Sequence, residues 1–386
     1  MAAKLIFNPS DDAFLTQRNL IKPATRRRRL ISSSILQSES LSSSDSGSGS
    51  GSSEGIDMKD FTIIPEFLES EETIEWLGWN PTKAAEIWNR WKEIQETEQD
   101  QGTIFEVEFL QCALGHIPGR SFEDGSSDWE EHMRSWGISD ELSDAIMDAD
   151  FTDIRCTESA QHWVTDTIEI RYLSLERIKR ESDQRTINNH TMNPSVASSA
   201  VPRYSRVPGL QTLFKAISTE RLRYSDSKIN IDSLVSEGAT DFRGYGGALY
   251  FTPDYKVADN YRRYIRRRVG STRALMIQLT LPNAWIEGLP PRVLEFGDLW
   301  KKLVHTSRQG NRLTGDMKYI RNLPLIIAPI AHSPNKAITR LETWTEVGIQ
   351  HVLKMPGQET LPVQYAFQVE DNFEEIEQIG ELKVVA

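Results

Sequence analysis

The segment Gly-Tyr-Gly-Gly-Ala-Leu-Tyr-Phe-Thr-Pro-Asp-Tyr, residues 244–255, combines a glycine turn, a short aromatic strand and the start of a helix. Its glycines permit positive φ angles and the close approach of a ligand or of another part of the chain. The apolar and aromatic residues 248–251 are typical of a short buried strand. Thr252 is expected to cap a helix that begins at Pro253. A strand that runs into a helix through an aromatic residue can hold a flat ring against the backbone, so we expect a ligand site here.

The helix expected after this strand has one apolar face. Its apolar positions recur at spacings of three and four, as in an amphipathic helix, and they are Val257, Ala258, Tyr261, Tyr264 and Ile265. The remaining face carries five arginines, namely Arg262, Arg263, Arg266, Arg267 and Arg268. An arginine face on an amphipathic helix is usually solvated, and we expect that here. The alternative is that it contacts the phosphates of a ligand or an acidic partner.

The same segment resembles the central motif of the ADP-ribosyltransferase superfamily. In that motif a glycine-rich turn leads to a strand that reads Gly-(Ile/Leu)-Tyr-Phe, and the following helix carries an alanine and a tyrosine. The matching residues are Gly247, Leu249, Tyr250, Phe251, Ala258 and Tyr261. The family tyrosine stacks on the nicotinamide of NAD, so the resemblance implies this role for Tyr250, with Gly246, Gly247 and Tyr261 beside the same ligand. It extends over about residues 210–369 and implies a split antiparallel β-sheet.

The family also places a basic residue on its first strand and a glutamate on a late strand. Lys215, in the expected strand 213–217, is the basic candidate for the adenosine half of NAD, although it could equally be an ordinary edge-strand lysine. Gln364 occupies the glutamate position. An amide accepts the same hydrogen bond but brings no charge, which removes roughly 3 kcal/mol of barrier lowering, or about a hundredfold in rate. Glu359 and Glu370 are close enough in sequence to supply a carboxylate instead.

The resemblance therefore implies cleavage of the nicotinamide glycosidic bond of NAD and transfer of ADP-ribose to a protein side chain or to water. Tyr250, Gln364 and Glu359 are the catalytic candidates, and NAD is a substrate that needs no metal. Expected partners are NAD and a protein acceptor. Glutamine at 364 and lysine at 215 favour two alternatives, a catalytically inactive module that binds NAD or ADP-ribose and a non-enzymatic interaction scaffold.

Composition limits the class of protein. With 56 acidic and 44 basic side chains, the net charge of the 386 residues is −12, which argues against a broad nucleic-acid surface. Cys112 and Cys156 are too few for a disulfide framework and lack the spacing of a zinc site. The sequence shows neither a signal peptide nor a long uncharged apolar run. We expect a soluble intracellular protein, cytoplasmic or nuclear, with no membrane contact.

The composition changes along the chain indicate two folded domains, with an α+β class overall. The expected parts are a disordered basic and Ser/Gly-rich tail over 1–58, a tryptophan-rich helical domain over 59–182, a linker over 183–206, an ADP-ribosyltransferase-like domain over 207–370 and an acidic tail over 371–386. Within the helical domain, helix starts are expected near Pro81, Ser139 and Thr157, and the tryptophans are expected to fill the core. Strands are expected over 212–217, 248–251, 274–281, 323–330, 349–355 and 362–369, with the last two forming a hairpin.

Overall fold

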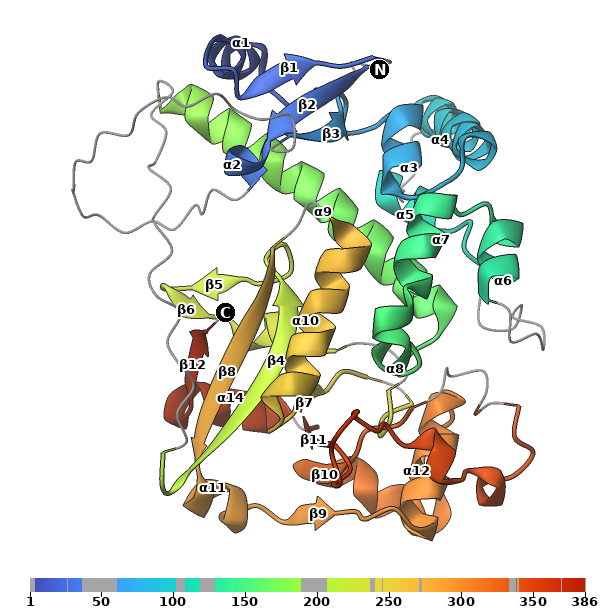
Figure 1. Cartoon of the computed structure of the whole chain (residues 1–386), viewed down its shortest axis with the longest axis vertical. Coiled ribbons are helices and arrows are strands. Elements are labelled where there is room, and N and C mark those ends of the chain that lie inside the picture. The colour runs from blue at the N-terminus through green and yellow to red at the C-terminus, as the bar shows by residue number, and fades with distance from the viewer. Residues whose placement is uncertain are drawn as a thin grey trace.

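The computed structural model describes residues 4–25, 27–36, 61–101, 108–118, 129–188, 207–236, 240–244, 246–270, 273–332, 338, 340–368 and 370–385. These residues combine helices with mainly antiparallel sheets, which is the α+β class (Figure 1). The helices gather in the N-terminal half of the chain, and most strands lie in the C-terminal half.

The N-terminal segment contains regular structure. Its elements are α1 (Pro9–Gln17), β1 (Ile21–Pro23), β2 (Arg28–Ser32) and α2 (Ser33–Leu36), followed by β3 (Phe61–Pro65). The three strands form an antiparallel sheet with β2 in the centre. The expectation of a disordered tail over 1–58 is therefore wrong for the described residues between 4 and 36, while residues 37–60 lie outside the described part.

Apolar burial and ion pairs explain why the N-terminal segment is ordered although the sequence predicted a disordered tail. Leu15, Ile21 and Ile31 are almost fully buried in the core that α1 and the sheet share with the helices. Arg29, from the basic cluster that was expected to be solvated, donates to Asp12 at 3.0 Å and to Glu66 at 2.8 Å. A few well-placed apolar residues offset the cost of ordering this polar segment.

Between β3 and the strands of the C-terminal half, the described residues form seven α-helices. They are α3 (Glu71–Leu77), α4 (Pro81–Gln101), α5 (Phe109–Leu114), α6 (Trp129–Trp136), α7 (Asp140–Met147), α8 (Thr152–Arg155) and α9 (Ala160–Ile187). Ser139 caps α7 as predicted, whereas Ser159 and not Thr157 caps α9. The buried tryptophans of this region are Trp79, Trp91, Trp136 and Trp163, which confirms the core assignment for these four.

Helix α9 runs past the predicted boundary at 182. Arg185 in its last turn makes a bidentate contact with Asp11 of α1, at 3.1 and 3.0 Å. This ion pair and the buried Ser182 hold the end of α9 against the N-terminal segment. The expected linker is therefore helical over 183–187, and residues 189–206 lie outside the described part.

The described residues of the C-terminal half form two larger sheets and a two-stranded one. Its strands are β4 (Leu210–Ser218), β5 (Tyr224–Ser225), β6 (Lys228–Ile229), β7 (Leu249–Phe251), β8 (Ala274–Pro282), β9 (Pro291–Val293), β10 (Leu325–Pro329), β11 (Val363–Phe367) and β12 (Glu381–Val384). Its longer helices are α10 (Tyr255–Val269), α11 (Asn283–Gly288), α12 (Asp298–Arg308) and α14 (Glu370–Ile379). One sheet has the order β12-β8-β4 and the other β7-β11-β10-β9, with only β9 parallel to its neighbour.

A pair of backbone hydrogen bonds connects the two larger sheets. Phe214 of β4 and Thr252, just after β7, exchange bonds of 2.7 and 2.9 Å. Strand β4 therefore lies beside β7, which in turn pairs with β11.

One predicted strand in this half, and the hairpin that depends on it, are wrong. Residues 349–355 contain a short 3-10 helix, Ile349–His351, and a single bridge between Val352 and Ala331, so the predicted hairpin does not form. Strand β11 pairs instead with β7 and β10. The predicted acidic tail over 371–386 contributes α14 and β12, and β12 completes a sheet by pairing with β8. The other strand predictions hold within a few residues.

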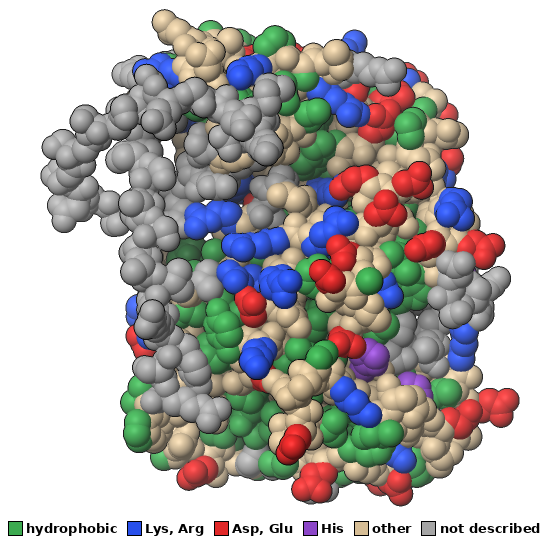
Figure 2. Space-filling view, in the orientation of Figure 1, with side chains coloured by type: hydrophobic (Ala, Val, Ile, Leu, Met, Phe, Trp, Pro, Cys, Tyr) green, Lys and Arg blue, Asp and Glu red, His purple; other side chains and the backbone are tan. Residues whose placement is uncertain are grey.

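Helix α10 lies between the first of these sheets and the helical region (Figure 1). Its Val257 and Tyr264 belong to the same core as Trp163 of α9. The prediction of a solvated arginine face is wrong for Arg268, which is only 1% exposed and donates to Asp166 of α9 at 2.8 Å. Lys and Arg side chains also gather near the middle of the face in Figure 2, so the negative net charge is unevenly distributed.

This shared core leads to a prediction about cleavage. If a protease site is inserted between residues 189 and 206 and cut, the two fragments should stay associated. Separating them would expose the apolar side chains of α10 that pack against the helices and would break the ion pair between Arg268 and Asp166. Size-exclusion chromatography should show both fragments in one peak, in contrast to the independent domain expected from the sequence. Separate peaks without denaturant would contradict the shared core.

Candidate functional site

Two predicted site residues lie on one face of the second sheet. Tyr250 of β7 is directly opposite Ala366 of β11, and Gln364 precedes Ala366 by two residues. Opposite residues in an antiparallel pair share a face, as do alternate residues along a strand. The side chains of Tyr250 and Gln364 are therefore diagonal neighbours.

The Tyr250 side chain is engaged within the protein. Its hydroxyl oxygen lies 2.6 Å from Oγ1 of Thr240, and its ring centroid is 6.3 Å from that of Phe242. Burial raises the pKa of the phenol well above its ordinary value. The hydroxyl therefore remains protonated at physiological pH, and the ring packs beside Phe242.

The Gln364 amide is also bound. It is 7% exposed, and its Nε2 donates to Oδ2 of Asp241 at 2.6 Å. At this distance the amide is one of the hydrogen-bond partners that compensate the buried Asp241 carboxylate for its lost solvation. Gln364 thus has an internal structural partner at the position where the resemblance expected a catalytic carboxylate.

Asp241 and Arg308 are site residues that the sequence did not reveal. Oδ2 of Asp241 also accepts from the Ala331 backbone at 2.8 Å, and its Oδ1 accepts from Nε of Arg308 at 2.7 Å. Arg308 is 3% exposed and also donates to the Glu158 carboxylate at 2.9 Å and to the Thr157 carbonyl at 2.8 Å. Burial alone would lower the pKa of Arg308, but Asp241 and Glu158 outweigh it and raise the pKa. The guanidinium therefore stays charged.

Lys215 lies beside the backbone of Tyr250. Its Nζ is 3.0 Å from Oγ of Ser236 and 3.5 Å from the Tyr250 carbonyl oxygen. Burial, with a smaller contribution from the nearby Arg221, lowers the pKa of Lys215 to about 8. Both hydrogen-bond partners are neutral, so this ammonium group is suited to an anionic ligand.

The glycines of the turn accommodate the protein's own chain. A Cβ on Gly247 would lie 2.3 Å from the Val235 side chain, and one on Gly244 would lie 2.5 Å from the Asn311 carbonyl oxygen. Gly246 is exposed and has a φ of +88°. The prediction that another group approaches these glycines closely is confirmed at Gly244 and Gly247, where the approaching groups belong to the protein itself.

Tyr261 points to the helical region and not to the Tyr250 ring. Its hydroxyl donates to Oγ1 of Thr157 at 2.9 Å, and its ring packs against the core of the helices. Its pKa is raised by burial. The structure therefore brings Lys215, Tyr250 and Gln364 into one neighbourhood, whereas the Tyr261 hydroxyl is bonded to Thr157, whose carbonyl accepts from Arg308.

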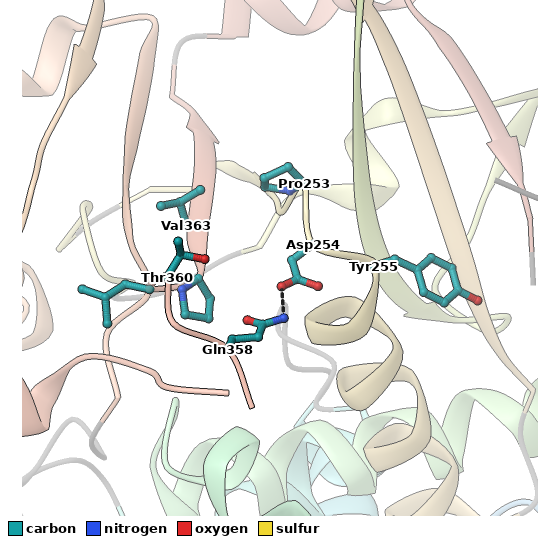
Figure 3. Close-up of a pocket in the computed structure, with 8 residues that line it drawn as sticks. Pro253, Asp254, Tyr255, Gln358, Thr360 and Val363 are labelled. Atoms are coloured by element: carbon teal, nitrogen blue, oxygen red, sulfur yellow. Dashed lines mark hydrogen bonds between the residues drawn. The ribbon is translucent and has the colours of Figure 1, made fainter. Parts of the chain in front are cut away.

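A pocket lies beside this neighbourhood, between the start of α10 and the loop before β11 (Figure 3). Its volume is about 330 Å³, and it is lined by Pro253, Asp254, Tyr255, Gln358, Thr360, Leu361, Pro362 and Val363. Gln358 donates to Oδ2 of Asp254 at 2.7 Å across it. Oδ1 of Asp254 accepts from the backbone of Lys256 at 2.9 Å, so Asp254 and not Thr252 caps α10.

None of Lys215, Tyr250 and Gln364 lines this pocket. Glu359 is exposed between two of the lining residues, Gln358 and Thr360. Glu370 begins α14, and its side chain lies outside the described part.

Among the described residues, no three or more His, Cys, Asp or Glu side chains are grouped so that they could hold a metal ion. Within the same ranges, no helix is both long and apolar enough to cross a bilayer. Comparison of the chain with models of protein families, with curated proteins and with solved structures found no match.

Proposed function

We propose that the C-terminal half is a module of the ADP-ribosyltransferase type that binds NAD or ADP-ribose without cleaving it. The 2.6 Å hydrogen bond from Gln364 to Asp241 carries this proposal. Cleavage of the glycosidic bond develops positive charge on the ribose, which a preorganised carboxylate would stabilise. A buried amide that already donates to another carboxylate provides no such charge.

The arrangement of three strands supports the ligand-binding part of the proposal. The resemblance implies that the first strand, the motif strand and the late strand surround the ligand. Their counterparts β4, β7 and β11 are adjacent, through the bridge at Thr252 and the pairing of β7 with β11. In the proposed complex, the Lys215 ammonium contacts a ligand phosphate and the Tyr250 ring stacks on a base or on nicotinamide.

Replacing Tyr250 by alanine should weaken ADP-ribose binding several-fold, because an aromatic stacking partner contributes about 1 kcal/mol beyond its buried area. Isothermal titration calorimetry on the full chain measures the change. Tyr250→Phe is the matched control, since it keeps the ring and removes only the bond to Thr240. If the phenylalanine variant loses as much affinity as the alanine variant, the ring is not the contact.

The affinity for ADP-ribose should fall roughly tenfold between pH 7 and pH 9. The pKa of Lys215 is about 8, so the group is mostly charged at pH 7 and mostly neutral at pH 9. The protonated fraction falls by roughly tenfold over this range, and a neutral amine loses its attraction for phosphate. Lys215→Arg stays charged and should remove the pH dependence. A flat profile in the unmodified protein would exclude Lys215 as the phosphate contact.

A second candidate function is cleavage of NAD with transfer of ADP-ribose to a protein side chain or to water. Glu359 favours it, because this exposed carboxylate is carried by the loop that lines the pocket and is not committed to the buried cluster. Nicotinamide release by the full chain and by Glu359→Gln tests this candidate. Release that requires Glu359 would establish it, and background rates in both proteins would remove it.

A further inference from the structure

A buried chain of hydrogen bonds connects the helical region to the sheet that carries Gln364. It runs from Glu158 to Arg308 at 2.9 Å, from Arg308 to Asp241 at 2.7 Å and from Asp241 to Gln364 at 2.6 Å. Asp241, Arg308 and Gln364 are all buried, while Glu158 at the other end is partly exposed. Because the inner hydrogen bonds are shielded from water, water cannot replace a partner that moves. A displaced side chain at one end therefore shifts the next side chain in the series.

The geometry at Asp241 determines what such a displacement would move. Its two carboxylate oxygens are divided, with Oδ1 held by Arg308 and Oδ2 by Gln364 and the Ala331 backbone. A shift of the guanidinium therefore reorients the acceptor of the Gln364 amide. The preceding residue, Thr240, bonds to the Tyr250 hydroxyl, so both side chains of the candidate site depend on this short segment.

A second buried arginine provides an internal comparison. Arg268 also joins the C-terminal half to the helices, but its side-chain hydrogen bonds go to Asp166, Thr167 and the Trp163 carbonyl, all on α9. The two arginines thus share burial and location between the same parts of the chain. They differ in that Arg308 contacts the segment that holds the candidate site.

We propose that Glu158 and Arg308 are positioning residues, through which the helical region fixes the orientation of the Gln364 amide and thereby controls ligand binding. The ligand-binding part of this inference rests on the proposed function. The positioning part rests only on the hydrogen bonds and can be tested without a ligand.

The test compares Glu158→Gln with two control variants of the full chain. Glu158→Gln keeps a hydrogen-bond acceptor at a partly exposed position and removes its charge. Asp166→Asn removes the charge that faces Arg268, and Arg267→Gln removes a more exposed ion pair with Asp148. The readouts are the NMR signal of the Gln364 side-chain amide, assigned by its loss in Gln364→Met, and the ADP-ribose affinity measured by calorimetry.

We expect Glu158→Gln to shift the Gln364 amide signal and to change the affinity by about fivefold, at the lower end of typical site-to-site coupling. Both controls should leave the signal in place, and Arg267→Gln should also leave the affinity unchanged, whereas Asp166 also pairs with Arg221, which lies near Lys215. A signal that stays in place in Glu158→Gln, or moves equally in the controls, would overturn the proposal. If Glu158→Gln shifts the Gln364 amide signal but leaves the ADP-ribose affinity unchanged, the claim that these residues control ligand binding is overturned. If the amide moves as expected but no protein binds ADP-ribose, positioning stands and the proposed function fails.

Discussion

Replacing Arg308 by methionine should lower the free energy of unfolding by about 3–5 kcal/mol, the usual cost of removing one partner from a buried ion pair. Asp241 is 4% exposed and would keep its bonds from Gln364 and the Ala331 backbone but lose its cation. Methionine preserves much of the aliphatic volume of arginine. The loss of stability therefore arises mainly from the Asp241 charge, which no longer has a cation opposite it. Urea denaturation of the full chain measures the effect.

A double variant separates the charge from other consequences of the substitution. In Arg308→Met/Asp241→Asn no buried carboxylate remains opposite the methionine, so the double variant should lose less stability than the two single variants add up to. Two outcomes would contradict a tightly buried ion pair. One is that the stability losses of the two single variants add up to that of the double variant. The other is that Arg308→Met loses less than about 1 kcal/mol, as is typical of exposed pairs.

The second large effect is expected for Gln364→Glu. From the resemblance alone, restoring the carboxylate should accelerate NAD cleavage by up to about a hundredfold. In the structure the new carboxylate would face Oδ2 of Asp241 in a buried site, where repulsion between like charges and loss of solvation both disfavour ionisation. We therefore expect a loss of about 3 kcal/mol of stability at neutral pH and no gain in nicotinamide release.

The pH dependence of this loss follows from the same contact. Burial and Asp241 should raise the pKa of the introduced carboxyl in the folded state above its unfolded value. The protonated carboxyl can donate to Asp241 as the amide does, so the variant should be nearly as stable as the parent below the unfolded pKa. Its stability should then decrease as the pH rises toward the folded pKa.

Thermal unfolding at pH 4.5 and pH 7.5 measures this pH dependence. The unfolding temperature of Gln364→Glu should lie further below that of the parent at pH 7.5 than at pH 4.5. Gln364→Met is the control, because it removes the hydrogen bond without adding a titrating group at this position. A Gln364→Glu protein that is as stable as the parent at pH 7.5 and releases nicotinamide faster would favour the enzymatic candidate instead.

Local patterns in the sequence predicted the elements around the motif well. The strand at 248–251 and the helix after it follow from short-range periodicity, which needs no knowledge of distant residues. The sequence predicts the helix cap at Thr252, because Thr suits that position and Pro253 after it suits the first helical residue. Thr252 is instead used by the bridge to Phe214 and donates to the Val363 carbonyl at 2.9 Å, which leaves Asp254 to cap α10.

Contacts between distant segments could not be predicted in this way. Asp241, Arg308 and Gln364 are isolated polar residues in the sequence, and only the packing of three separate segments brings them together. The ordered N-terminal segment was missed for a similar reason, since β2 pairs with β3 across residues 37–60. Strand β12 was not predicted because the sequence around it is acidic, and its pairing with the distant strand β8 cannot be seen from neighbouring residues. Val385, directly after β12, is buried beside β8.

The most direct test of ligand binding without turnover is a titration of NAD into the full chain, with nicotinamide measured in the same sample. We expect a saturable heat of binding for NAD and ADP-ribose, nicotinamide at the level of a protein-free control, and weaker binding by Tyr250→Ala. The absence of any heat with both ligands would contradict the proposed site. Nicotinamide that increases with protein concentration and disappears in Glu359→Gln would show that the module is an enzyme.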